Sequence, residues 1–404
     1  MKLFKYEMKK ILFNKARLIL LVLLFALYGF LGFVLAAESE MRNTPQEPEA
    51  AVIYAEMIEQ HTGPFNQETL RECQEIVKAA VAEYGKGEEM EHQLRINPSL
   101  KFATQYVNFG KQVDIYWNGP ESQAADNILG VYPIQEKLKE LEGANRADSS
   151  EYNHYQQRLE LERQIGEPVF AKTGIWSAFF LMFDWVFIVF LFLMALTFFI
   201  SPLFTQEVRT EMDSILLCSL KGRREIVTAK LLAAALTSAI LAAGYLGASL
   251  IGMMIGSGDF SGWGASARCL EIYAQAPFDL TVGTLVIMSI AWLIFSTVVF
   301  GLALAFISCK MKNQSAAFGI GIVVLLAGMM SGSIPKSLYS ILWPVVDFHF
   351  GALAMFNTIF SGVKTYTIGE TPVSYGTMAL IVCLVLGILA CLLTYLAQKK
   401  RSAV

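Results

Sequence analysis

The chain has 404 residues, of which 54% are hydrophobic and only 17% are charged. A soluble protein usually carries about 25% charged residues, and here long uncharged runs alternate with short charged segments. This pattern excludes a single soluble core and predicts membrane spans together with one water-exposed part. The net charge of −3 says little, because it averages segments of opposite sign. The six cysteines form no CxxC pair, which argues against a zinc or redox site, and a Cys73–Cys269 disulfide is left open.

Apolar runs of the length that a helix needs to cross about 30 Å of hydrocarbon recur along the chain. The first is Leu18–Ala37, preceded by a lysine-rich segment at residues 1–17. An uncleaved span is preferred there to a signal peptide cleaved after Ala36-Ala37, because signal peptides have shorter apolar cores. Five more runs follow, at Trp176–Phe204, Leu231–Gly256, Leu280–Cys309, Ser315–Ile334 and Tyr375–Ala397. Since backbone polar groups must be satisfied within the segment in lipid, we expect an all-α polytopic membrane protein with six transmembrane helices.

Lysine and arginine mark the expected orientation of these spans. They gather in residues 1–17, between the second and third runs, in the link at 310–314 and after the sixth run. The loops of opposite parity hold only Arg268, Lys336 and Lys364 outside the long polar stretch. Both termini are therefore predicted to be cytoplasmic, with the chain passing several times through the plasma or inner membrane.

The polar stretch Glu38–Lys172 then lies outside the cell membrane. It holds 24 acidic and 13 basic residues and is too long for a simple loop. Apolar residues recur at helical spacing over Gln67–Tyr84, Tyr132–Leu141 is a second helical candidate, and the sequence Asp-Ser-Ser-Glu at 148–151 resembles a capping box that opens a third helix. We expect an inserted, mainly helical extracytoplasmic domain between the first two spans.

A second interruption, Lys336–Thr371, is moderately apolar but is broken by Pro344 and Gly351. A full crossing here would reverse the orientation of the C-terminus, so we expect a re-entrant or extracytoplasmic segment, with its irregular backbone covered by protein or facing water. Asp347 and His349 within it are interpreted as a hydrogen-bonded pair rather than a metal or catalytic site.

Two further features bear on mechanism. Phe4, Met8, Ile11 and Leu12 share one helical face among lysines, which predicts an amphipathic helix at the cytoplasmic membrane surface. A simple basic anchor is equally compatible with the composition.

Asp184 is the only acid within a predicted span. An intramembrane acid is costly, so Asp184 is a candidate for a substrate path, with an interfacial position beside Trp185 as the simpler alternative.

The segment at residues 205–230 combines alternating charges with apolar residues, a glycine break and a basic cluster. Mixed charge on a short cytoplasmic helix suits docking to a soluble partner. Its Glu207, Leu216-Leu217, Gly222-Arg223, Ile226 and Lys230 resemble the pattern in permeases of the ABC-2 (type-two exporter) family, where a glutamate follows the second span, a short coupling helix comes next, and an arginine and a lysine precede the third span. The basic N-terminal helix, the six-span plan and the broken stretch before the last span fit this resemblance. The large domain after the first span departs from the minimal plan, although some bacterial members carry such insertions.

The resemblance implies a bacterial ABC exporter permease that works with a separate ATP-binding subunit and with a second permease subunit, identical or different. The chain itself has no GxxxxGKS or GxxxxGKT loop to hold phosphates, so ATP and magnesium are expected on the partner, and no enzymatic activity, cofactor, metal site or nucleic-acid binding is expected here. The expected substrate is amphipathic, lipid-like or peptidic. A membrane receptor for an external ligand is the alternative. The residues expected to contact the ATPase are Glu207, Arg209, Glu211, Asp213, Leu216, Leu217, Arg223 and Arg224.

Overall fold

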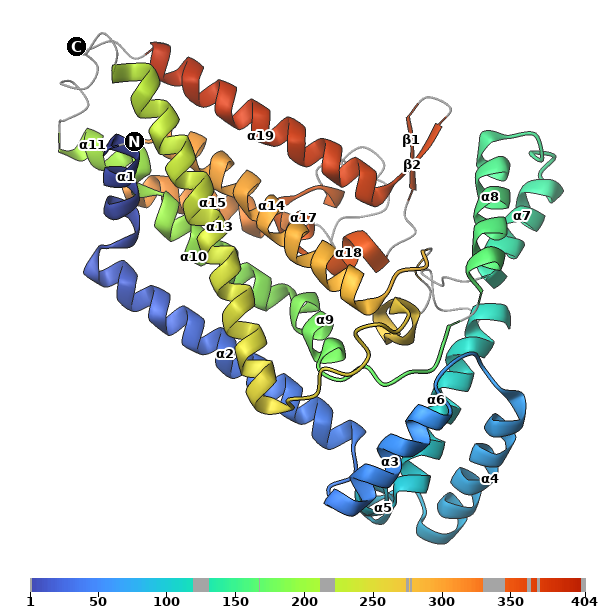
Figure 1. Ribbon diagram of the computed structural model, residues 1–404. Helices are drawn as coiled ribbons and strands as arrows, with labels where there is room; N and C mark the ends of the chain where they lie inside the picture. Colours follow the sequence, from blue (N-terminus) through green and yellow to red (C-terminus); the bar gives the residue numbers. More distant parts are fainter. Residues whose placement is uncertain are drawn as a thin grey trace.

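The computed structural model describes residues 2–118, 131–166, 168–210, 222–273, 276, 278–329, 346–361, 365–368 and 371–400. Helices account for nearly all of the regular structure in this part (Figure 1). The exception is a two-stranded antiparallel hairpin, β1 (Thr365–Ile368) with β2 (Thr371–Ser374). The expected all-α class is therefore confirmed, and the hairpin is an addition that the sequence did not predict.

Five stretches of helix in the described residues are long and apolar enough to cross a membrane. They are α2 (Lys15–Asn43), α10 (Val186–Ile200) continued by α11 (Pro202–Arg209), α13 (Gly222–Gly256), α14 (Val282–Lys310) and α19 (Tyr375–Lys400). Their length and composition indicate a membrane protein. The predicted fifth span, Ser315–Ile334, begins within the shorter helix α15 (Gln314–Met329), and its last residues lie outside the described part.

The second predicted span, Trp176–Phe204, is not one continuous helix. It is divided into α9 (Trp176–Asp184) and α10, with Trp185 between them in an extended conformation at φ −76° and ψ 101°. The hydroxyl of Tyr28 on α2 donates to the carbonyl of Ile188, 3.3 Å away, in the first turn of α10. Asp184 ends α9 with an exposed side chain. Its place in a substrate path and its alternative place at the interface both stay predictions.

Helices α2 and α13 approach each other closely because both carry glycines where they meet. A Cβ atom at Gly252 would lie 1.8 Å from the carbonyl oxygen of Gly29, and one at Gly32 would lie 2.4 Å from that of Ser249. Small residues at helix crossings allow this kind of backbone contact between membrane helices. The opposite face of α2 exposes Leu18, Ile19, Val22 and other large apolar side chains, as expected of a helix that faces lipid.

The polar stretch after α2 folds into helices that lie together on one side of the bundle, beyond the end of α2 (Figure 1). They are α3 (Pro48–Gln60), α4 (Gln67–Tyr84), α5 (Glu88–Ile96), α6 (Pro98–Asn118), α7 (Val131–Gly143) and α8 (Ser150–Ile165). The predicted helix Gln67–Tyr84 is confirmed, and the side chain of Asn66 caps it by accepting from the backbone N–H groups of Glu68 and Thr69. Ser149 caps α8 in the same way.

A buried ion pair connects these helices to the loop between α13 and α14. The guanidinium of Arg268 donates to Glu162 Oε2 at 3.1 Å and to the carbonyl of Gly166, and both charged side chains are buried. The hydroxyl of Tyr116 on α6 donates to the same carboxylate oxygen at 3.0 Å. Burial and the charge of Glu162 raise the pKa of Tyr116 to about 12, so the hydroxyl keeps its proton as donor at physiological pH.

The broken segment before α19 contains two short helices, α17 (Phe350–Ala354) and α18 (Phe356–Ser361), followed by the hairpin. His349 caps α17 by accepting from the N–H of Ala352 at 3.1 Å, while Asp347 accepts from the hydroxyl of Tyr366 at 2.6 Å. Among the described residues, no group of three or more histidines, cysteines, aspartates and glutamates could hold a metal ion.

Candidate functional site: the Lys230 cluster

The N-terminal helix meets two helices from the middle of the chain near the start of α13. The three elements are α1 (Lys2–Leu12), the end of α11 and the third turn of α13. Helix α1 packs Phe4, Met8 and Leu12 against the core of the bundle, and its Ile11 is fully buried there. The amphipathic helix predicted at residues 1–17 therefore forms, but its apolar face contacts protein. The reason is that α11 and α13 present an apolar surface that this face can cover.

A group of four charged side chains lies where these helices meet, and we call it the Lys230 cluster: Glu7, Lys10, Glu207 and Lys230. The ammonium of Lys230 lies 2.6 Å from Glu207 Oε1 and 3.3 Å from Glu7 Oε2. It also donates to the backbone carbonyl of Leu203 at 2.6 Å. The side chain of Lys230 is 0% exposed. These three oxygens supply one acceptor for each of the three N–H donors of its ammonium.

The cluster balances its charges. Lys10 approaches Glu207 Oε1 at 3.4 Å and Glu7 Oε2 at 3.8 Å, so two ammonium groups face two carboxylates. An isolated charge in an apolar interior is very costly, and it is tolerated only when it is paired and hydrogen-bonded. The ring of Phe204, 5.0 Å from the Lys230 ammonium, adds a cation–π contact on one side.

This arrangement connects α1, α11 and the start of α13. Glu7 comes from α1, Glu207 from α11 and Lys230 from α13, and removing any one of them leaves the other buried charges unbalanced. Arg17 strengthens the link to α2, because its guanidinium donates to the carbonyls of Lys10 and Ile11, both at 3.0 Å, at the end of α1. The four helices are thus joined by charge as well as by packing.

Only part of the predicted contact segment can be compared with the structure. Glu207 belongs to the Lys230 cluster and its side chain is 15% exposed. Arg209 and Arg224 are exposed on the two sides of the segment. Arg223 lies in the first turn of α13, but its side chain is outside the described part, as are the predicted residues Glu211, Asp213, Leu216 and Leu217.

Sequence reasoning did not select Glu7 or Lys10 as site residues, and it cited Lys230 only for the family pattern. One signal was available: Glu7 lies between Phe4 and Met8 on the apolar side of α1, where a carboxylate needs a cation from another element. The identity of that cation cannot be read from local spacing, since Lys230 is 223 positions away.

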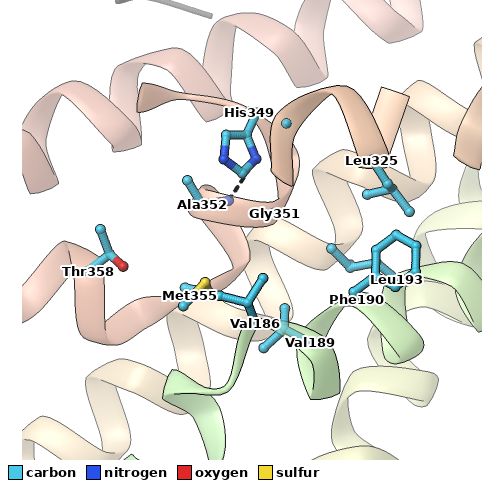
Figure 2. A pocket seen from close by; sticks show the side chains of 11 residues that line it. Val186, Val189, Phe190, Leu193, Leu325, His349, Gly351, Ala352, Met355 and Thr358 are labelled. Atoms are coloured by element: carbon cyan, nitrogen blue, oxygen red, sulfur yellow. Dashed lines mark hydrogen bonds between the residues drawn. The ribbon is translucent and has the colours of Figure 1, made fainter. Parts of the chain in front are cut away.

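A pocket lies elsewhere in the bundle, between α10, α15 and α17 (Figure 2). Its volume is about 180 Å³, and its lining is mainly apolar, with Val189, Leu193 and Met355 among the wall residues and His349 at one edge. Asp184, the candidate for a substrate path, does not line it. A mainly apolar pocket of this size could take a small apolar group.

No protein-family model matches the chain, and no curated protein or solved structure matches it either.

Proposed function

We propose that the chain is the membrane-spanning permease subunit of an ABC exporter of the ABC-2 type, with ATP hydrolysed by a separate subunit. The observation that carries the proposal is the Lys230 cluster. It joins the N-terminal helix to the end of α11 and the start of α13, the two helices that flank the charged segment at residues 211–221. A force applied to that segment by a partner reaches three helices of the bundle at once.

The charges around the segment fall into two groups with different roles in this proposal. Glu207 is turned into the bundle and pairs with Lys230, so it transmits movement. Arg209 and Arg224 are exposed and are free to meet acidic groups on an ATP-binding subunit. Exposed charges at the rim of an interface mainly steer association, while buried pairs hold it.

The proposed substrate is amphipathic, lipid-like or peptidic. The apolar hollow between α10, α15 and α17 suits the apolar part of such a molecule. The acidic stretch Glu38–Lys172, with 24 acidic and 13 basic residues, favours a cationic part by electrostatic attraction. A functional exporter would pair this chain with a second permease subunit and two ATP-binding subunits.

The experiment is an affinity purification of the tagged chain from its native membranes in mild detergent at low salt. We expect an ATP-binding protein to co-purify and to hydrolyse ATP, and the double variant Arg209→Glu/Arg224→Glu to retain several-fold less of it. The matched control is Lys399→Glu, an exposed cation at the end of α19.

Three results would reject the proposal. One is ATP hydrolysis by the chain when it is free of other ATPases. Another is equal recovery of the ATP-binding protein with the double variant and the wild type. The third is the absence of any ATP-binding protein at every detergent and salt concentration tested.

A further inference from the structure

Helix α1 has two faces of different chemistry. The inner face carries Glu7, Met8 and Ile11 against the bundle. The side chains on the opposite face point away from it: Lys5 and Lys9 are exposed, and two aromatic residues are exposed among them, Tyr6 at 64% and Phe13 at 70%. At 100° per residue, Lys5, Tyr6, Lys9 and Phe13 fall within one side of the helix. We call this set the outer face of α1.

The outer face of α1 leads directly into a lipid-facing surface. Phe13 continues α1, its N–H donating to the carbonyl of Lys9 at 3.0 Å, and α2 begins two residues later with an exposed Lys15. From there the exposed side chains of α2 are large and apolar, starting with Leu18 and Ile19. In a membrane crossed by α2, the outer face would therefore lie where the hydrocarbon core gives way to headgroups.

The orientation of the outer face is fixed by contacts already described. The Lys230 cluster holds Glu7 on the inner side, and Arg17 binds the last carbonyls of α1. Helix α1 cannot roll to bury Tyr6 and Phe13 without exposing Glu7 and Ile11, which would break the buried ion pairs.

We propose that the outer face of α1 binds anionic phospholipid headgroups of the leaflet in which α2 begins. Lysines near such a surface attract anionic lipids. Tyr6 is favoured at the interface because its ring is apolar while its hydroxyl meets polar groups, and Phe13 adds apolar contact. The one acidic side chain of α1 is Glu7, which is buried in the cluster. The charge that this face offers is therefore positive, which fits an anionic surface. The membrane contact is on the side opposite to the one that amphipathicity alone predicts.

The test measures binding of a fluorescent short-chain phosphatidylglycerol, and of its phosphatidylcholine counterpart, to the full-length protein in neutral detergent. The variant is Lys5→Gln/Lys9→Gln, and the matched control is Lys312→Gln/Lys399→Gln, two exposed lysines outside α1. Each lysine near an anionic surface contributes about fivefold in affinity. We expect the double variant to bind phosphatidylglycerol about 25-fold more weakly at low salt, with phosphatidylcholine binding unchanged and the difference reduced in high salt.

A second variant tests the aromatic residues separately. Tyr6→Ser/Phe13→Ser keeps the lysines, and we expect it to weaken binding of both lipids to a similar extent. The proposal is overturned if Lys5→Gln/Lys9→Gln binds phosphatidylglycerol as tightly as wild type, or if the control loses as much affinity. It is also overturned if the lysine variant keeps its lipid affinity but loses a co-purifying protein, because the outer face would then be a protein-docking surface.

Discussion

At the scale of single residues, the central feature is an amine that water cannot reach. Lys230 is surrounded by two carboxylates, a carbonyl and an aromatic ring. Its contribution to stability is not the sum of these contacts, because the ammonium also loses its hydration when it is buried. Separating the partners would cost considerable free energy, and the arrangement therefore favours one relative position of α1, α11 and α13.

Replacing Lys230 with methionine keeps most of the side-chain volume and removes the charge. We expect Lys230→Met to destabilise the protein by about 3–5 kcal/mol, because Glu7 and Glu207 are left with one cation between them. Lys10→Met is the comparison variant. It also leaves two carboxylates with one cation, but its ammonium lies farther from them, at 3.8 and 3.4 Å, and its side chain is 14% exposed, so we expect a smaller loss than for Lys230→Met. Thermal unfolding of the purified protein in detergent measures both. Equal losses for the two variants would show that the buried amine has no special role.

The loop that follows α13 provides a pH-dependent contact. Burial alone would raise the pKa of Asp259, but a hydrogen bond with Lys172, 2.9 Å away, and another from the N–H of Ser261 outweigh it, so the pKa of this carboxyl is lowered. A lowered pKa in the folded state means that the folded protein is stabilised above the unfolded value of about 4 and loses this contribution as the pH falls through the folded value.

We therefore expect Asp259→Asn to lower the unfolding temperature at pH 7 and to have a progressively smaller effect as the pH falls below about 4. The control is Asp148→Asn, at an exposed position between α7 and α8, which should leave the unfolding temperature unchanged at neutral pH. Thermal unfolding in detergent over a pH series gives the comparison. A constant difference between Asp259→Asn and the wild type at every pH would contradict this account.

At the scale of helices, α13 is the element on which the others depend. Its 35 residues extend over about 50 Å. It holds Lys230 near one end, packs against α2 and α14 along its length, and leads into the loop that carries Asp259 and Arg268 at the other end. The ion pairs at both ends of the bundle, those of Lys230 at one end and those of Asp259 and Arg268 at the other, are therefore made by one helix and the loop that follows it.

The crossing of α13 with α2 gives a matched pair of glycine substitutions. A Cβ at Gly252 would meet the backbone of Gly29, which cannot move without separating the helices, whereas a Cβ at Gly247 meets nothing within 4 Å. We expect Gly252→Ala to destabilise by at least about 1–3 kcal/mol, and Gly247→Ala to be neutral or slightly stabilising. Unfolding temperatures in detergent decide the matter, and similar values for both variants would mean that the close approach is not required.

The helices themselves were largely predictable, because long apolar runs and the 3.6-residue period are local signals. The boundaries of α4 follow from its periodicity and from Asn66 as its cap. The break at Trp185 was not predicted, because a single acid, Asp184, in an otherwise apolar run does not distinguish an interrupted helix from a continuous one. The hairpin after α18 was missed for a similar reason, as it is short and lies in a segment without a clear period.

The candidate site was predictable only in outline. Glu207 and Lys230 were noticed because they lie in a charged segment between two apolar runs. Their pairing with each other and with Glu7 arises from tertiary packing, and a sequence pattern contains no information on which of several lysines meets which carboxylate. The expectation that Glu207 contacts a partner stays a prediction, and its position in the Lys230 cluster adds an internal role.

At the scale of the whole molecule, charge separates the two ends of the bundle. The helices α3–α8 belong to an acidic stretch, and exposed lysines and arginines lie near the start of α2, the start of α13 and the end of α19. The buried pair of Arg268 with Glu162 attaches the acidic part to the bundle. We therefore expect the acidic helices to stay on one side of the membrane, with the protein inserted in a single orientation.

That orientation is the last prediction. Because cationic residues are retained on the cytoplasmic side, α3–α8 should face outward and the link between α14 and α15 inward. Ala147, which is exposed between α7 and α8, and Lys312, which is exposed in that link, are suitable for a labelling experiment in a chain whose native cysteines have been replaced. In intact cells an impermeant thiol reagent should label Ala147→Cys and leave Lys312→Cys unlabelled until the cells are lysed. The reverse pattern would invert the topology, and it would also move the Lys230 cluster and the outer face of α1 to the other side of the membrane, where no ATP-binding subunit could reach them.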